Sequence, residues 1–84
     1  MEKEIGKVTH YFGKIGVAVI LLSDNLAVGD TIKVRRGEEE FEQKVESMQV
    51  EHQNIESGKA GDEVAIKVSQ PAKEGAIVYK VEQD

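Results

Sequence analysis

The feature that most constrains the fold is a short phrase that occurs twice. Residues 28–34 read VGDTIKV, and residues 60–68 read AGDEVAIKV. In each copy Gly-Asp follows a small or apolar residue, and apolar and polar residues then alternate. Gly readily adopts a positive φ, and an Asp side chain can accept a hydrogen bond within its own turn. Alternation is the period of a half-buried strand. Two turns that each lead into such a strand predict a small β-barrel or β-sandwich.

The remaining segments complete an all-β chain of a single domain, residues 1–84, with its core at 5–82. We expect six strands, at residues 4–12, 15–22, 31–35, 40–53, 63–69 and 76–81. Ile5 is out of phase with Val8 and Phe12, which predicts a bulge near Gly6. The same phase places Phe12 in the core and leaves Tyr11 exposed or packed at a barrel end.

Two segments carry less regular patterns. The run 15–22 (IGVAVILL) is almost entirely apolar, which is typical of a strand that is buried on both faces. Residues 39–55 place apolar side chains at intervals of three and four, which by periodicity favours an amphipathic helix. A strand is the alternative there if a bulge near 46–47 shifts the phase, and the β-rich neighbours favour it. The following loop, 54–61, is expected to hold one helical turn.

The order of these phrases resembles a known domain. The segments that carry the resemblance are 16–20, 28–32, 45–48, 58–64 and 75–78. Together they are similar to the second domain of translational GTPases such as elongation factor Tu, which implies a closed six-stranded β-barrel over residues 5–82. The chain has no GxxxxGK[ST] phosphate loop, so GTPase activity is not expected. The residues that hold aminoacyl-tRNA in those factors have no clear counterparts in this sequence.

Two further runs give a closer resemblance. Residues 6–12 (GKVTHYF) and 41–49 (FEQKVESMQ) resemble small free-standing translation elongation factor-like proteins of prokaryotes. They also resemble the C-terminal barrel of collagenase-like peptidases, some of which are linked to RNA modification. The resemblance implies a long bent strand at 40–53. It does not imply proteolysis, because those peptidases keep their active site outside the barrel.

Composition and charge restrict the partners. The net charge is −5, whereas a non-specific nucleic-acid binder is usually basic, so we expect no DNA partner. The absence of cysteine excludes a disulfide or a thiolate metal site. The charged N-terminus has no signal-type apolar segment after it, and no run is long enough to span a bilayer. We therefore expect a cytoplasmic protein without a membrane partner.

A local basic surface is the candidate site for RNA or an acidic partner. Lys33, Arg35 and Arg36 project from one strand and its turn, and Lys14 and the aromatic Tyr11 extend the candidate set. Lys3 and Lys7 join them if the first strands lie adjacent. The simpler interpretation is that these cations pair across the hairpin with the glutamates at 38–42.

No catalytic or metal-binding constellation stands out. His10 and His52 are the only histidines, and neither lies in a recognisable ligand or nucleophile motif. The contiguous glutamates at 38–40 lack the staggered spacing of a Ca²⁺ loop and are typical of a solvated hairpin. We therefore predict no enzyme activity, no metal and no cofactor.

The sequence supports two functions. The first is a non-catalytic module that docks on RNA, a ribosomal component or a translation or RNA-modification protein. The alternative is an accessory subunit that binds a collagenase-like peptidase or an RNA-modifying enzyme through protein–protein contacts.

Overall fold

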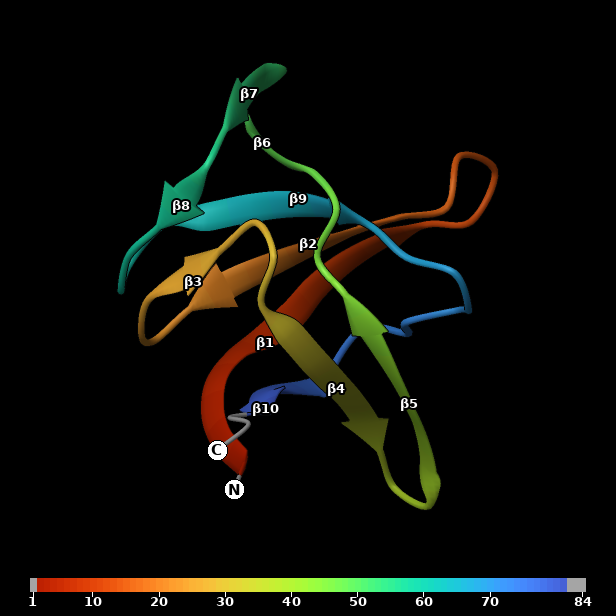
Figure 1. Ribbon diagram of the computed structural model, residues 1–84. Coiled ribbons are helices and arrows are strands. Elements are labelled where there is room, and N and C mark those ends of the chain that lie inside the picture. Colours follow the sequence, from red (N-terminus) through yellow and green to blue (C-terminus); the bar gives the residue numbers. More distant parts are fainter. Residues whose placement is uncertain (1, 82–84) are drawn as a thin grey trace.

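The computed structural model describes residues 2–81 and consists of strands, turns and loops (Figure 1). No helix occurs in this part of the chain, which confirms the all-β class. The end of the predicted core, residue 82, lies outside the described residues. The strands are β1 (Glu2–Phe12), β2 (Val17–Leu22), β3 (Leu26–Ala27), β4 (Thr31–Arg36), β5 (Glu39–Lys44), β6 (Met48–Val50), β7 (Gln53–Ile55), β8 (Ser57–Gly58), β9 (Glu63–Lys67) and β10 (Ile77–Val81).

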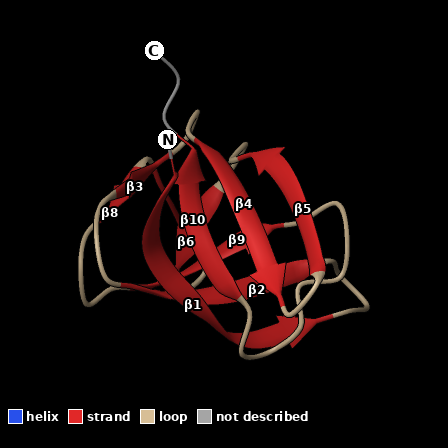
Figure 2. Cartoon of the chain, turned by 90° about the horizontal axis from the view of Figure 1, so that it is seen from below, coloured by secondary structure: helices blue, strands red, loops and turns tan. Residues whose placement is uncertain are grey.

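Eight of these strands form one strongly curled antiparallel sheet in the order β5-β4-β10-β1-β2-β9-β6-β7 (Figure 2). The strands β3 and β8 pair separately as a two-stranded sheet. The core lies inside the curl and consists of aliphatic side chains and Met48. Among the described residues no polar or charged side chain is buried.

The large sheet curls without closing. β5 and β7 are its two ends, and no backbone ladder joins them, so the predicted closed six-stranded barrel is not confirmed. Instead, the side-chain amide of Gln43 on β5 reaches the end of β9. Its Nε2 donates to the carbonyl of Lys67 at 2.8 Å, and its Oε1 accepts from the N–H of Ser69 at 2.8 Å. One side chain therefore supplies the donor and acceptor that a neighbouring strand would supply.

The two Gly-Asp phrases form the same turn. Gly29 has φ +100° and Gly61 has φ +94°. Asp30 Oδ2 accepts from the N–H of Ala27 at 2.9 Å, and Asp62 Oδ2 accepts from the N–H of Lys59 at 3.0 Å. The N–H of Asp30 also donates to the carbonyl of Ala27, and the N–H of Asp62 donates to the carbonyl of Lys59. The prediction of two equivalent turns that lead into strands is confirmed, with β4 following the first turn and β9 the second.

Each of these turns is also anchored to the end of another segment. The N–H of Gly29 donates to the carbonyl of Val45, and the N–H of Val45 donates to the carbonyl of Asp30, both at 2.8 Å. The second turn bonds Leu22, at the end of β2, in the same way. The N–H of Gly61 donates to the carbonyl of Leu22, and the N–H of Leu22 donates to the carbonyl of Asp62. Because Val45 and Leu22 are core residues, the paired turns fix two corners of the sheet against the core.

Strand β1 contains two bulges. The predicted irregularity near Gly6 is confirmed, since the register with β10 shifts between Glu4 and Gly6. A second shift, against β2, lies at Thr9, whose hydroxyl donates to the carbonyl of Val19 at 3.3 Å. Beyond Val8, this shift exchanges the side chains that point to the core with those that point to the solvent. The prediction that Phe12 is a core residue is therefore wrong: Phe12 is 50% exposed, and Tyr11 packs against the core.

Residues 39–55 contain strands and no helix, so the helical alternative is wrong. The single long bent strand expected at 40–53 is also wrong in its extent, because the segment is divided into β5, β6 and β7. β5 ends at Lys44, and β6 begins at Met48 after a break at 45–47, where the phase change was expected. Glu51 and His52 then form a two-residue turn with φ +50° and +65°. This turn sends β7 back along β6, and β8 goes on to pair with β3. The helical turn expected at 54–61 is therefore absent from this described segment.

Candidate binding surface

The basic residues of β4 lie opposite a row of glutamates. In the register with β5, Lys33 faces Glu42, Arg35 faces Glu40 and Arg36 faces Glu39. Lys33 also donates a hydrogen bond to Glu2 from the N-terminal end of β1. Opposite charges on directly paired strand positions attract one another. The hairpin β4–β5 therefore presents alternating signs of charge instead of a purely basic face.

The electrostatics of Lys33 follow from this arrangement. The hydrogen bond to Glu2 raises the pKa of Lys33 above its ordinary value, and partial desolvation opposes this shift. The charge on Glu2 and the carboxylates of Glu40 and Glu42 raise the pKa further. Lys33 is thus held in its charged form by acidic neighbours, which also reduce its availability to an external anion.

The other predicted site residues are dispersed. Lys14 is exposed in the β1–β2 turn, which lies well away from the β4–β5 hairpin (Figure 1). Tyr11 is half-buried and packs against the core. Lys7 lies in the same row as Arg35, with Ile77 of β10 between them. Lys3 pairs with Asp24 instead of joining the basic set.

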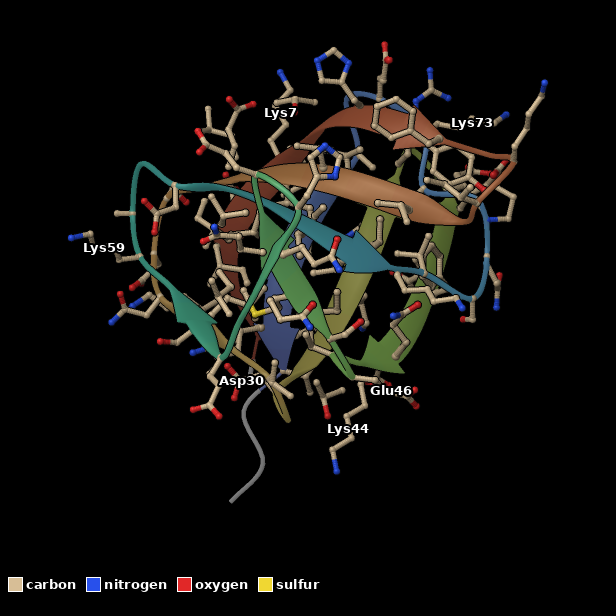
Figure 3. The ribbon with its side chains drawn as sticks, turned by 90° about the horizontal axis from the view of Figure 1, so that it is seen from above. Lys7, Asp30, Lys44, Glu46, Lys59 and Lys73 are labelled. Atoms are coloured by element: carbon tan, nitrogen blue, oxygen red, sulfur yellow. The ribbon has the colours of Figure 1, made fainter. Side chains whose placement is uncertain are left out.

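The charged side chains labelled in Figure 3 are also spread around the molecule. Lys7, Lys59 and Lys73 project outward on different sides, and Lys44 and Glu46 project from the opposite edge. Since these groups diverge, they do not converge on a common ligand position. The labelled groups therefore form no cluster of one sign of charge.

The histidines occupy exposed positions. His10 Nδ1 lies 3.8 Å from Glu74 Oε2, and the His10 ring stacks on Phe12 with centroids 6.4 Å apart. His52 lies in the β6–β7 turn. No group of three or more His, Asp or Glu side chains suited to a metal ion occurs within residues 2–81.

The depressions on the surface of residues 2–81 include three of moderate size. The first, about 420 Å³, lies beside β3 and β8 and is lined by Ala27, Ser57, Lys59 and Lys80 among others. The second, about 360 Å³, flanks the Gln43 bridge, with Lys44, Glu46, Ser47 and Lys67 in its wall. The third, about 260 Å³, lies where Phe41 and Arg36 meet Pro71 and Ala72. Each mixes polar and apolar walls.

One surface escaped the sequence analysis. The run 15–22 was expected to be buried on both faces, but only Ala18, Ile20 and Leu22 of β2 are buried. Val17 and Val19 point to the outside and are half-buried, and Leu21 is 44% exposed. The outer face of β2 is thus apolar, and residues 2–81 cover it only in part. The signal was present in the sequence, because a strand that is apolar on both faces is normally covered on both.

No helix within residues 2–81 is long and apolar enough to cross a membrane.

The comparisons with known proteins place the fold. No family model matches the chain. An uncharacterized protease of Methanocaldococcus jannaschii is 36% identical over 81 residues, which cover 95% of this chain and 20% of that protein. The chain therefore spans about a fifth of the length of this curated relative.

Two solved structures share the architecture. The crystal structure of the C-terminal domain of a Geobacillus thermoleovorans protein classed as a U32 peptidase matches with a TM-score of 0.89 at 22% identity, over 95% of this chain and 93% of that one. The selenomethionine form of the same domain matches with a TM-score of 0.86 at 22% identity, over 90% and 96%. The expected likeness to the C-terminal barrel of collagenase-like peptidases is confirmed as a likeness of fold, and the likeness to elongation factor Tu stays a prediction.

Proposed function

We propose that the chain is a non-catalytic binding domain that associates with the peptidase portion of a U32-type protein. The observation that carries this proposal is the similarity to the M. jannaschii relative, a protein named as a protease in which the matched segment is only 20% of the length. The fold shared with the C-terminal domain of a protein classed as a U32 peptidase supports it independently. A segment that accompanies a much larger protein is suited to docking on it.

The chemistry of the described surface supports a binding role over a catalytic one. His10 is paired with an exposed carboxylate and stacks on a ring, and no hydrogen bond or ion pair among residues 2–81 joins it to a nucleophile. General acid–base or covalent catalysis requires a base, a nucleophile and an orienting group within hydrogen-bond reach. The chain supplies no such set among residues 2–81.

The RNA-docking alternative has weaker support. Each predicted cation of β4 faces a glutamate, so the net field over the hairpin is small. Affinity for RNA depends on neutralising phosphates with unpaired cations. RNA is therefore the less favoured partner, and the co-purification experiment includes RNA binding as a possible result.

The test is co-purification from cells of the organism that encodes the chain. A tagged chain is recovered with and without nuclease, and bound proteins are identified by mass spectrometry. We expect a U32-type peptidase to be enriched equally in both samples. Enrichment of RNA, with loss of all bound protein after nuclease, would contradict the proposal.

A further inference from the structure

We propose that the outer face of β1, β2 and β9 is the surface by which this chain docks on the peptidase portion of a U32-type protein. The inference rests on the proposed function and adds to it the surface and the chemistry of the partner. The partner's complementary surface is predicted to be apolar at its centre and to carry both signs of charge at its rim.

The docking face is a grid of nine residues in three rows. The strand registers place β2 between β1 and β9, so each outward residue of β2 has one neighbour on either side. The rows are Lys7–Leu21–Glu63, His10–Val19–Ala65 and Phe12–Val17–Lys67. The centre of the face is therefore apolar, and the charged residues Lys7, Glu63 and Lys67 lie at three of its four corners.

The apolar character continues beyond the grid. Ile15, in the turn that joins Phe12 of β1 to Val17 of β2, is 64% exposed and adds an apolar side chain at this end of the two strands. On the other side, Gln49 of β6 pairs with Ala65 and donates to Asn54 at 2.9 Å. The face thus passes from an apolar centre to a polar rim, which is the usual anatomy of a protein–protein interface.

The opposite part of the sheet has a different composition. On β4 and β5, Lys33 and Arg35 face Glu42 and Glu40 across the hairpin. Those outward positions carry charges that water solvates well, whereas β2 offers Val17, Val19 and Leu21 to the outside. A contiguous apolar patch rimmed by polar groups on a small protein marks a site of interaction.

The strand itself indicates that the face is normally covered. β2 reads VAVILL, so its outward residues are as apolar as its inward ones. The inward residues are buried in the core, whereas the outward ones keep part of their surface exposed: Leu21 is 44% exposed, and Val17 and Val19 are half-buried. A partner that packs on the outer face of β2 would bury these outward residues, as expected for a strand that is apolar on both faces.

A larger protein is a better occupant than a second copy of the chain. The matched segment of the M. jannaschii relative is accompanied by four-fifths of additional polypeptide, which provides a body to pack against. Self-association would bring together two chains of net charge −5, and this repulsion opposes a dimer. Lys7 and Lys67 are positive and Glu63 is negative, so the rim is complementary to a partner surface that carries charges of both signs.

The test compares matched variants in a binding measurement. The purified chain is titrated against the full-length U32-type peptidases of the organism that encodes it, with biolayer interferometry as the readout. Leu21→Glu places a charge in the face, and Val28→Glu, at 41% exposure on the turn before β4, is the control. Leu21→Gln is the milder second variant, and thermal unfolding checks that each protein is folded.

We expect Leu21→Glu to weaken binding by about 10-fold or more, and Val28→Glu to change it by less than about twofold. Wild-type affinity for both folded Leu21 variants would overturn the docking face and leave the proposed function intact. Absence of binding by the wild-type chain would overturn both. A dimer of the chain that Leu21→Glu dissociates would overturn the choice of partner.

Discussion

Gln43 is joined to Ser69 by two hydrogen bonds: its Oε1 accepts from the backbone N–H at 2.8 Å and from the hydroxyl at 3.2 Å. With the bond from Nε2 to the carbonyl of Lys67, the side chain links β5 to the segment after β9. The sheet is therefore held in its curled form at this point by a side chain, where a closed barrel would use a backbone ladder.

Removal of this bridge tests its contribution. Gln43→Ala loses all three hydrogen bonds and is expected to lower the free energy of unfolding by about 1–2 kcal/mol, because the freed backbone groups regain only solvent partners. Gln43→Glu keeps the acceptor for Ser69 and loses the donor to Lys67, so an intermediate loss is expected. Urea unfolding at pH 7 gives both values. Equal stability of all three proteins would show that the bridge is dispensable.

The twin turns give a second prediction. Gly29 and Gly61 have positive φ, and a Cβ added at either would meet no atom within 4 Å. Alanine there is therefore expected to act through backbone strain alone and to cost about 1–2 kcal/mol at each site. The measurement is thermal unfolding of the single and double variants. A decrease in the free energy of unfolding of less than about 0.3 kcal/mol at both sites would contradict the expected backbone strain.

The β6–β7 turn gives a prediction of opposite sign. Glu51 and His52 both have positive φ, the conformation for which two-residue hairpins normally use Asn-Gly. The double variant Glu51→Asn, His52→Gly is expected to raise the free energy of unfolding by roughly 1–2 kcal/mol. The reversed order, Glu51→Gly and His52→Asn, is the control and should gain less. Destabilisation by the first variant would mean that the native side chains make compensating contacts.

These features show what the sequence could and could not predict. The turns at Gly29 and Gly61 were predictable because Gly and Asp act locally, and so was the phase change at 45–47. The exposure of Phe12 was not, because the bulge at Thr9 is made by a residue without a distinctive backbone preference. The hairpin at Glu51–His52 was not predicted because a positive φ is uncommon for residues other than glycine, and this pair lacks the Asn-Gly or Asp-Gly signal of a two-residue turn.

The candidate surface was less predictable than the fold. The cations of β4 were visible in the sequence, but their pairing with glutamates followed only from the register with β5. The bridge that Gln43 makes to a distant backbone segment could not be predicted either, because it depends on the path of the whole sheet. The apolar outer face of β2 was encoded in the run 17–22, but which face stays uncovered depends on the whole sheet.

Asp24 provides a pH-dependent test. Its hydrogen bond with Lys3 lowers the pKa of the Asp24 carboxyl, and the N–H of Asn25 acts in the same direction. A carboxyl with a lowered folded pKa stabilises the fold above its unfolded pKa, and this contribution is lost as the pH falls through the folded pKa. Asp24→Asn is therefore expected to reduce stability at pH 7, with the difference shrinking toward pH 2.

Carboxyl ¹³C NMR titration of the wild-type chain measures the shift directly. The Asp24 signal is expected to titrate at lower pH than that of an aspartate in an unstructured peptide. Lys3→Met should move the midpoint upward, since it removes the main cause of the shift. A midpoint that Lys3→Met leaves unchanged would contradict the assigned cause.

The most direct test of the central claim is a methyl NMR titration of the labelled chain with the full-length U32-type peptidase of its organism. The account predicts that the methyl signals of Val17, Val19 and Leu21 shift or broaden on binding, while those of Val28 stay unchanged. Saturable binding that perturbs Val28 and leaves the β2 methyl groups unaffected would contradict the docking face. No perturbation at any methyl group would contradict the association itself.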